Sequence, residues 1–134
     1  MRKINKIILH CSATKEGRQF TAKDIDQWHK QRGWKGIGYH YVILLDGTVQ
    51  SGRPESEIGA HAVGQNANSI GICYIGGLDV DGKAKDTRTD QQKMAMNNLV
   101  SDLLKKYPGS TVHGHNEFAN KACPCFNVKK EFGQ

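Results

Sequence analysis

Hydrophobic and polar positions follow two periodicities along the chain, one typical of short buried strands and one typical of amphipathic helices. Apolar runs rich in β-branched residues predict four strands, at 7–10, 39–45, 70–75 and 111–113. The pair Asp46-Gly47 predicts a two-residue hairpin turn, from which the chain returns along residues 48–51.

Two capping boxes mark the expected helices. In the first, Thr21 precedes Asp24, and the helical pattern that follows ends at Gly33. In the second, Thr89 precedes Gln92, and an apolar stripe at helical spacing follows. The stripe comprises Met96, Leu99, Val100, Leu103, Leu104 and Tyr107, and we expect it to lie in the core. A short last helix is expected at 128–132.

The order of these elements, β-α-β-β-β-α-β, predicts an α/β fold with a mixed central sheet flanked by helices. One domain over residues 1–134 is expected, because two domains of half this length would each have too small a core. The longest apolar run, 41–45, is far shorter than the roughly 20 residues of a membrane span. The run at 7–9 is too short for a secretory signal, so cytoplasmic synthesis without a signal peptide is expected.

Charge and cysteine content narrow the class of partner. The 19 Lys and Arg residues exceed the 13 Asp and Glu residues, giving a net charge of +6 that favours an anionic partner. No helix has a basic face and no aromatic-basic motif is present, so nucleic acid is not the expected partner. Without a signal peptide, the four cysteines are expected to be free thiols or metal ligands, with Cys11 and Cys73 as small core residues.

Histidine and cysteine residues gather around predicted strand ends. His10 ends the first strand, His113 and His115 flank the end of the last strand, and Cys123 and Cys125 follow in a loop. Two imidazoles and one thiolate form a zinc set that leaves the fourth position for water, whose pKa the metal lowers to about 7. The residue types alone leave open which histidines and which cysteine bind. Metal-free buried histidines and thiols are the alternative.

Five segments carry a resemblance to a known family. They are Ile7-Ile-Leu-His-Cys-Ser-Ala-Thr14, Gly38-Tyr-His-Tyr-Val-Ile43, Asp46-Gly-Thr-Val49, Asn68-Ser-Ile-Gly-Ile72 and Lys121-Ala-Cys-Pro124. In this order they resemble the zinc-dependent N-acetylmuramoyl-L-alanine amidases of the phage-lysozyme type, which are relatives of the peptidoglycan recognition proteins. The resemblance runs from about residue 7 to 132 and includes the segment 27–34.

The resemblance implies His10, His115 and Cys123 as the zinc ligands. His115 is preferred over His113 because the family's histidine ligand lies eight residues before the cysteine, as 123 − 115 = 8 here. Cys125 occupies a position where the family relative has a small polar residue, so it is a competing thiolate.

The resemblance also implies that Tyr39 and Lys121 complete the catalytic site. Zinc polarises the scissile carbonyl and delivers hydroxide, and Lys121 would stabilise the oxyanion that develops. Tyr39 would bond the water or the oxyanion, or pass a proton to the leaving amine. Which of the two residues has which role stays open.

A Gly- and Asn-rich loop at 58–68 is where the family places glycopeptide contacts. His61, Asn66 and Asn68 are therefore the expected substrate-binding residues, with a plain loop histidine and turn-forming asparagines as the alternative. His40 follows Tyr39, so strand alternation predicts that it faces the opposite way and is structural. His29 is expected to be a packing or surface residue.

The resemblance implies a peptidoglycan hydrolase that cleaves the amide bond between N-acetylmuramic acid and L-alanine. We expect a monomer that acts on the cell wall after release through a holin lesion or a secretion apparatus. One alternative is a non-catalytic peptidoglycan-binding module, disfavoured because all three ligand types are present. The other is a regulator of an RNA polymerase. The segment before His10 is shorter than in the phage relative with that activity.

Overall fold

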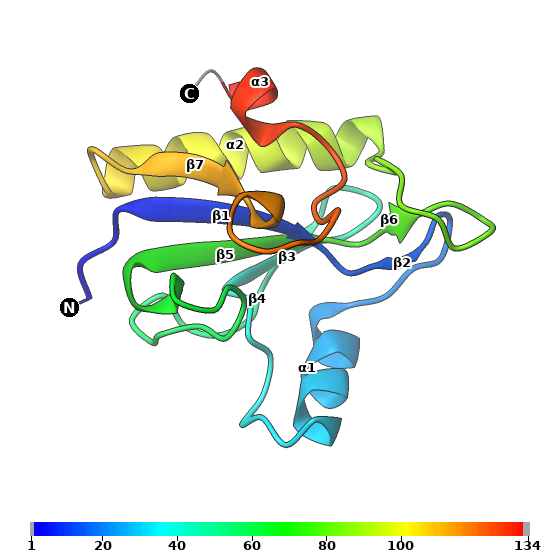
Figure 1. The fold of residues 1–134 in the computed structure, drawn as a ribbon, viewed down its shortest axis with the longest axis horizontal. Helices are drawn as coiled ribbons and strands as arrows, with labels where there is room; N and C mark the ends of the chain where they lie inside the picture. Colours follow the sequence, from blue (N-terminus) through cyan, green and yellow to red (C-terminus); the bar gives the residue numbers. More distant parts are fainter. Residues whose placement is uncertain (1, 133–134) are drawn as a thin grey trace.

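A mixed sheet runs through the centre of the computed structural model, which describes residues 2–132 (Figure 1). The elements in chain order are β1 (Lys6–Cys11), β2 (Thr14–Lys15), α1 (Ala22–Gln31), β3 (Tyr41–Ile43), β4 (Val49–Ser51), the 3₁₀ turn η1 (Asn66–Asn68), β5 (Ser69–Tyr74), β6 (Gly77–Leu78), α2 (Asp90–Lys106), β7 (Thr111–Gly114), the 3₁₀ turn η2 (His115–Glu117) and α3 (Val128–Phe132). The main sheet has the order β4-β3-β5-β1-β7. Among the strand pairs of this sheet only β3–β4 is antiparallel, which confirms the predicted mixed sheet and the hairpin. The two-residue turn expected at Asp46-Gly47 is wrong, because the backbone N–H of Leu44 donates to the backbone oxygen of Thr48 at 2.8 Å and the loop therefore has three residues, 45–47.

Strand β1 lies between β5 and β7 in the main sheet. It pairs in parallel with β5, where His10 is opposite Cys73, and with β7, where Leu9 is opposite Gly114. Parallel strands end at the same edge of a sheet, and ligand sites of α/β proteins lie at that edge. The carboxyl ends of β1, β5 and β7 therefore bring His10 close to the segment that follows β7.

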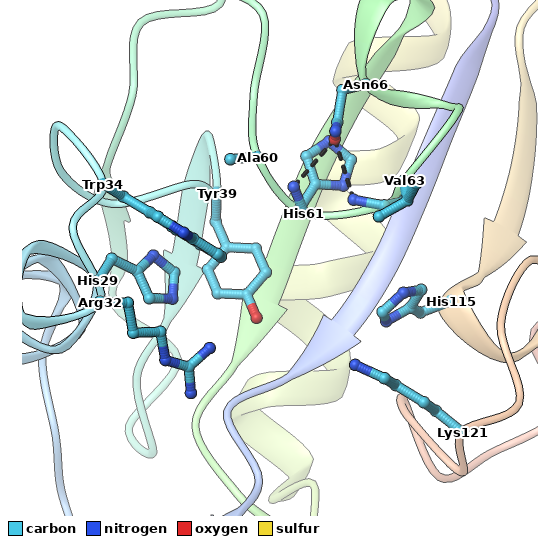
Figure 2. Close-up of a pocket in the computed structure, with 11 residues that line it drawn as sticks. His29, Arg32, Trp34, Tyr39, Ala60, His61, Val63, Asn66, His115 and Lys121 are labelled. Carbon is cyan, nitrogen blue, oxygen red and sulfur yellow. Dashed lines mark hydrogen bonds between the residues drawn. The ribbon is translucent and has the colours of Figure 1, made fainter.

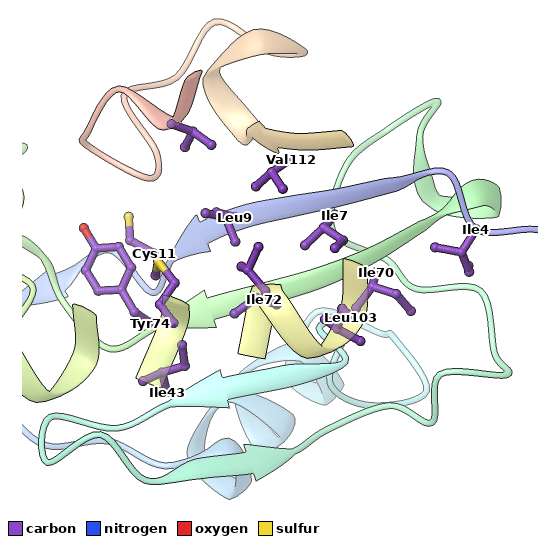
Figure 3. Packing of buried hydrophobic residues seen from close by; sticks show 13 residues of the cluster. Ile4, Ile7, Leu9, Cys11, Ile43, Ile70, Ile72, Tyr74, Leu103 and Val112 are labelled. Atoms are coloured by element: carbon purple, nitrogen blue, oxygen red, sulfur yellow. The ribbon is translucent and has the colours of Figure 1, made fainter. Parts of the chain in front are cut away.

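The two faces of the sheet carry different helices and different cores. Ile7 and Leu9 of β1 pack with α2 in a buried cluster, part of which Figure 3 shows. On the other face, Val42 and Cys73 pack with Ile25 of α1 in a second cluster. The alternation of side chains along β1 places His10 on the face opposite Leu9, away from the α2 core. The α2 stripe expected from the sequence supplies Met96, Val100 and Leu103 as buried core residues.

A buried glutamine joins the N-terminus of α2 to the sheet. The Nε2 group of Gln92 donates to the backbone oxygens of Ile43 at 3.2 Å and Ile75 at 3.0 Å. Its Oε1 accepts from the backbone N–H of Thr89 at 3.0 Å, which completes the predicted capping box. Gln92 is fully buried and its amide cannot reach water. Its hydrogen bonds to the backbone therefore take the place of hydrogen bonds to water.

Two further details differ from the sequence-based expectations. The strand expected at 39–45 spans only Tyr41–Ile43, and Leu44 already belongs to the hairpin turn, where its N–H donates to the backbone oxygen of Thr48 at 2.8 Å. A small parallel pair, β2 with β6, has no counterpart among the expected strands, since two-residue strands have no measurable periodicity. Among residues 2–132, none of the helices has the length and apolar character needed to cross a bilayer.

Arg2 ties the chain ahead of β1 to the segment that leads into β5. Its guanidinium donates to the backbone oxygen of Glu55 at 2.6 Å and to that of Ser69 at 3.1 Å. It also donates to the backbone oxygens of Asn66 and Ala67, at 3.3 and 3.2 Å. One side chain therefore binds both ends of the loop that precedes β5.

Replacing Gln92 tests whether this polar junction stabilises the fold. We expect Gln92→Met to lower the free energy of unfolding by about 2–4 kcal/mol, because buried backbone groups lose their partners while the volume is retained. Chemical denaturation measured by circular dichroism reports the change. Gln91→Met, at the exposed neighbouring position, is the matched control and should change stability by less than about 0.5 kcal/mol. Equal effects of the two substitutions would contradict the prediction.

Candidate metal centre and cleft

Three potential ligand side chains converge at the carboxyl edge of the sheet. His10 comes from β1, His115 opens η2 directly after β7, and Cys123 lies in the loop that follows. Their ligand atoms all lie within 4.8 Å of one another. The rings of His10 and His115 have centroids 4.6 Å apart. These are the three residues that the family resemblance implies as zinc ligands, and a triangle of this size could hold one metal ion.

Backbone contacts hold the cysteine of this triangle in place. The backbone N–H of Cys11, at the end of β1, donates to Sγ of Cys123 at 3.1 Å. Sγ of Cys125 instead lies 3.3 Å from the backbone oxygen of Gly77 and 4.0 Å from Sγ of Cys11. All four cysteines are free thiols. Cys125 is therefore close to the centre but outside the triangle.

His113 and His40, the other histidines near these elements, have partners of their own. The ring of His113 bonds to Glu117 at 2.9 Å and to Thr111 at 2.6 Å, outside the triangle. His40 accepts from the backbone N–H of Gly71 at 3.0 Å and donates to the backbone oxygen of Glu57 at 2.9 Å. The strand alternation expected to separate His40 from Tyr39 does not apply, because β3 begins only at residue 41.

Burial keeps the histidines of the site neutral. Desolvation, with smaller contributions from His61, His115 and Lys121, lowers the pKa of His10 well below its ordinary value. Burial and the charge of Lys121 also lower the pKa of His115. A neutral imidazole has a free lone pair, which is the form that binds metals. The two imidazoles are therefore in the protonation state that metal binding requires.

A cleft of about 450 Å³ opens beside the triangle, and a second lobe of about 210 Å³ adjoins it. His115, Tyr39 and Lys121 line both lobes. In Figure 2 the Tyr39 hydroxyl and the Lys121 ammonium point into the cleft from opposite walls, with His115 beside the lysine. Burial, followed by nearby thiols, raises the pKa of Tyr39 well above its ordinary value, so its hydroxyl stays protonated and can donate.

Of the three residues expected to bind substrate, two line the cleft and one does not. His61 and Asn66 line the cleft, and Oδ1 of Asn66 accepts from the backbone N–H groups of His61 and Ala62, each at 2.9 Å. The ring of His61 is largely buried and lies 2.9 Å from His10, Nδ1 to Nε2. Asn68 lies outside the cleft, because its side chain donates to the backbone oxygen of Lys3 at 2.8 Å.

The wall of the cleft opposite His115 was not recognised from the sequence. It consists of His29, Arg32 and Trp34, at the end of α1 and just beyond it. The rings of His29 and Trp34 have centroids 4.5 Å apart, and the Arg32 guanidinium lies 5.8 Å from the Trp34 ring. His29 is buried, as one of its two expected roles requires, but it also faces the cleft. The segment 27–34, part of the family resemblance, was the available signal.

Comparisons with known proteins find relatives over nearly the whole chain. Residues 1–126 match a family model described as N-acetylmuramoyl-L-alanine amidase. The chain is 46% identical over 124 residues to the endolysin of Escherichia phage T7, covering 92% of this chain and 82% of the relative. It is 33% identical over 126 residues to peptidoglycan-recognition protein SC2 of Drosophila simulans, covering 91% of this chain and 65% of the relative.

Solved structures lead to the same family. The N-acetylmuramoyl-L-alanine amidase LysC from Clostridium intestinale URNW superposes with a TM-score of 0.82 at 34% sequence identity. The superposition covers 98% of this chain and 83% of that protein.

The two neighbouring cysteines offer a direct test of the metal triangle. We expect Cys123→Ser to lose bound zinc, because a thiolate at the centre is replaced by a poor ligand, whereas Cys125→Ser should retain it. Zinc per protein after dialysis, measured by plasma mass spectrometry, distinguishes the two variants. Loss of zinc in Cys125→Ser with retention in Cys123→Ser would move the ligand to Cys125.

Proposed function

The chain belongs to the N-acetylmuramoyl-L-alanine amidase family, and from this membership we propose that His10, His115 and Cys123 would hold a catalytic zinc ion. The protein is a peptidoglycan hydrolase of that family, which cleaves the amide bond between N-acetylmuramic acid and L-alanine of the stem peptide. The convergence of the three ligand atoms within 4.8 Å, beside an open cleft, is the observation that supports the zinc centre.

The chemistry of the donor set fits zinc in a catalytic rather than a structural role. Two imidazole nitrogens and one thiolate are ligands that zinc prefers, and three protein ligands leave one position open. When bound, zinc supplies a Lewis acid for the amide carbonyl and lowers the pKa of a water molecule towards about 7. Tyr39 and Lys121 line the cleft beside these ligands and could supply a proton and a positive charge there.

We propose that Lys121 and Tyr39 stabilise the developing charge and donate the proton that the reaction needs. The Lys121 ammonium lies at the mouth of the site and can stabilise the negative charge that develops on the amide oxygen. The Tyr39 hydroxyl, which burial keeps protonated, can donate a hydrogen bond or deliver a proton to the leaving nitrogen of alanine. Their positions on opposite walls support this division, because the amide has its oxygen and its nitrogen on different sides of the carbonyl carbon.

The cleft is lined by positively charged side chains, which suits a substrate that carries carboxylates. Arg32 and Lys121 line both lobes, and within residues 2–132 no Asp or Glu lines either one. A stem peptide carries carboxylates, so it would enter a cleft with a matching positive potential. We propose that the wall formed by His29, Arg32 and Trp34, together with Asn66, contacts the glycopeptide.

The oligomeric state of the protein and its route to the cell wall are also part of the proposed function. All residues of the centre and the cleft come from one chain, which supports a monomer with a single catalytic domain over 1–134. Because the substrate is a wall polymer, we propose that the protein acts on the cell wall after release through a holin lesion or a secretion apparatus.

The products formed from purified cell walls test the proposed function. Digestion should create new alanine amino termini, detected by dinitrophenylation, and no new reducing sugars. His115→Ala should lose zinc and activity together, since one of the three ligands is missing. New reducing ends would instead indicate a glycosidase, and an active zinc-free His115→Ala variant would contradict the metal centre.

The role of Lys121 predicts a loss of turnover without a loss of metal. Removing an oxyanion-stabilising donor lowers kcat by about 10²–10³ in other enzymes, and we expect Lys121→Met to fall in this range. Zinc content should stay at the wild-type level, because Lys121 is not one of the three ligands. Lys130→Met, an exposed position on α3, is the matched control and should leave kcat unchanged. A Lys121→Met enzyme with wild-type kcat would remove this residue from the mechanism.

A further inference from the structure

A chain of hydrogen bonds runs from the backbone oxygen of Gln65, in the loop before β5, to the ring of His10. Oγ of Ser69 donates to the backbone oxygen of Gln65 at 2.8 Å. The same Oγ lies 3.3 Å from Nε2 of His61, and Nδ1 of His61 lies 2.9 Å from Nε2 of His10. Ser69 and His10 lie on the neighbouring strands β5 and β1, whereas His61 comes from the loop before β5.

The direction of every bond in this chain follows from its first member. A backbone oxygen can only accept, so the single hydroxyl proton of Ser69 is directed at Gln65. Oγ of Ser69 must then accept the proton on Nε2 of His61, which leaves Nδ1 of His61 with a lone pair. That lone pair accepts the proton on Nε2 of His10. His10 is therefore left with a lone pair on Nδ1.

We propose that His61 is a positioning residue for the metal centre, which fixes His10 as the tautomer with its proton on Nε2 and presents Nδ1 to the zinc ion. The proposal rests on the proposed zinc site and deepens it. Metal-binding histidines generally donate their second N–H to an acceptor, which sets both the tautomer and the ring orientation. Here the acceptor is another histidine, whose own tautomer is set by a serine.

The packing around His61 favours this role over a substrate contact. Only 8% of the residue is exposed, and its ring lies against the Cα of Gly71. A Cβ at position 71 would come within 2.6 Å of the ring, so the strand has room for His61 only because residue 71 is glycine. Asn66 fixes the backbone of His61 from the other side. The ring of His61 is therefore buried and tightly packed, and both of its nitrogens already have hydrogen-bond partners. These contacts hold the ring beside His10.

The tautomer can be observed without any metal. Long-range proton–nitrogen correlation spectra of the metal-free, ¹⁵N-labelled protein should show His10 and His61 protonated on Nε2. In Ser69→Ala, His61 loses the group that selects its tautomer, and we expect a mixture of tautomers at both histidines. A His10 protonated on Nδ1 in the wild-type protein would overturn the proposal.

Metal affinity provides the second readout. Leu and Asn have nearly the same shape, but only Asn carries an oxygen that can replace Nδ1 of His61 as an acceptor. We expect His61→Leu to weaken zinc binding by about 10–100-fold, as loss of an outer partner of a ligand does elsewhere. His61→Asn should bind zinc nearly as tightly as the wild type. Competition with a chromophoric chelator measures both, and the absorption bands of the cobalt-substituted proteins report ligand geometry.

Two comparison variants separate the explanations. His40→Leu removes a buried histidine whose bonds do not lead to His10, and it should destabilise the fold without weakening zinc binding. Wild-type zinc affinity in His61→Leu, while His115→Ala loses zinc, would refute the positioning role and leave the proposed function intact. Wild-type affinity in His115→Ala as well would refute the zinc site itself. Equal loss of zinc in His61→Leu and His61→Asn would also contradict the proposal, because the acceptor would then be irrelevant.

Discussion

The pairing register of β1 between β5 and β7 is the constraint on which the rest of the site depends. With Leu9 opposite Gly114, the end of β1 lies beside the first residues after β7, so His10 and His115 face one another. A slip of one residue would turn His10 into the α2 core and Leu9 into the cleft. The same slip would move the Cys11 amide away from Cys123. The register of the sheet therefore also sets how the three candidate ligands converge, and the apolar alternation of β1 fixes that register.

Buried polar groups connect the elements around this edge. Gln92 bonds to Ile43 at the end of β3 and to Ile75 just after β5. His61 joins the loop before β5 to Ser69 on β5 and to His10 on β1. Within residues 2–132, every buried side-chain nitrogen or oxygen has a hydrogen-bond partner. Burying such a group without a hydrogen-bond partner would cost free energy of folding. Each group therefore favours the arrangement of elements in which its partner is present. Hydrophobic packing makes the layers compact, and these polar bonds select how the layers align.

The sequence predicts most of the fold because its signals are local. β-branched runs mark β1 and β5, and the boxes at Thr21 and Thr89 mark where α1 and α2 begin. The strands β2 and β6 were missed because each pairs over only two residues.

The site is predictable as residue types and only partly as geometry. Family-like segments single out His10, His115 and Cys123, which the fold brings together. The contact of His61 with His10 joins residues 51 positions apart, and no periodicity in either segment signals it. The placement of Asn68 outside the cleft likewise depends on a long-range bond, to the backbone of Lys3. Such contacts exist only once the strands are paired.

The bonds of Arg2 have a consequence for the thermodynamics of substrate binding. By binding the backbone at Glu55 and at Ser69, this side chain closes the loop between them before any substrate arrives. Fixing the backbone of a flexible residue costs about 1–2 kcal/mol of conformational entropy. For this loop that cost is incurred during folding, so association with a glycan strand need not include it. The wall of the cleft that carries His61 and Asn66 is in this sense ordered in advance, so Arg2, which lies outside the lining of the cleft, would contribute to substrate affinity.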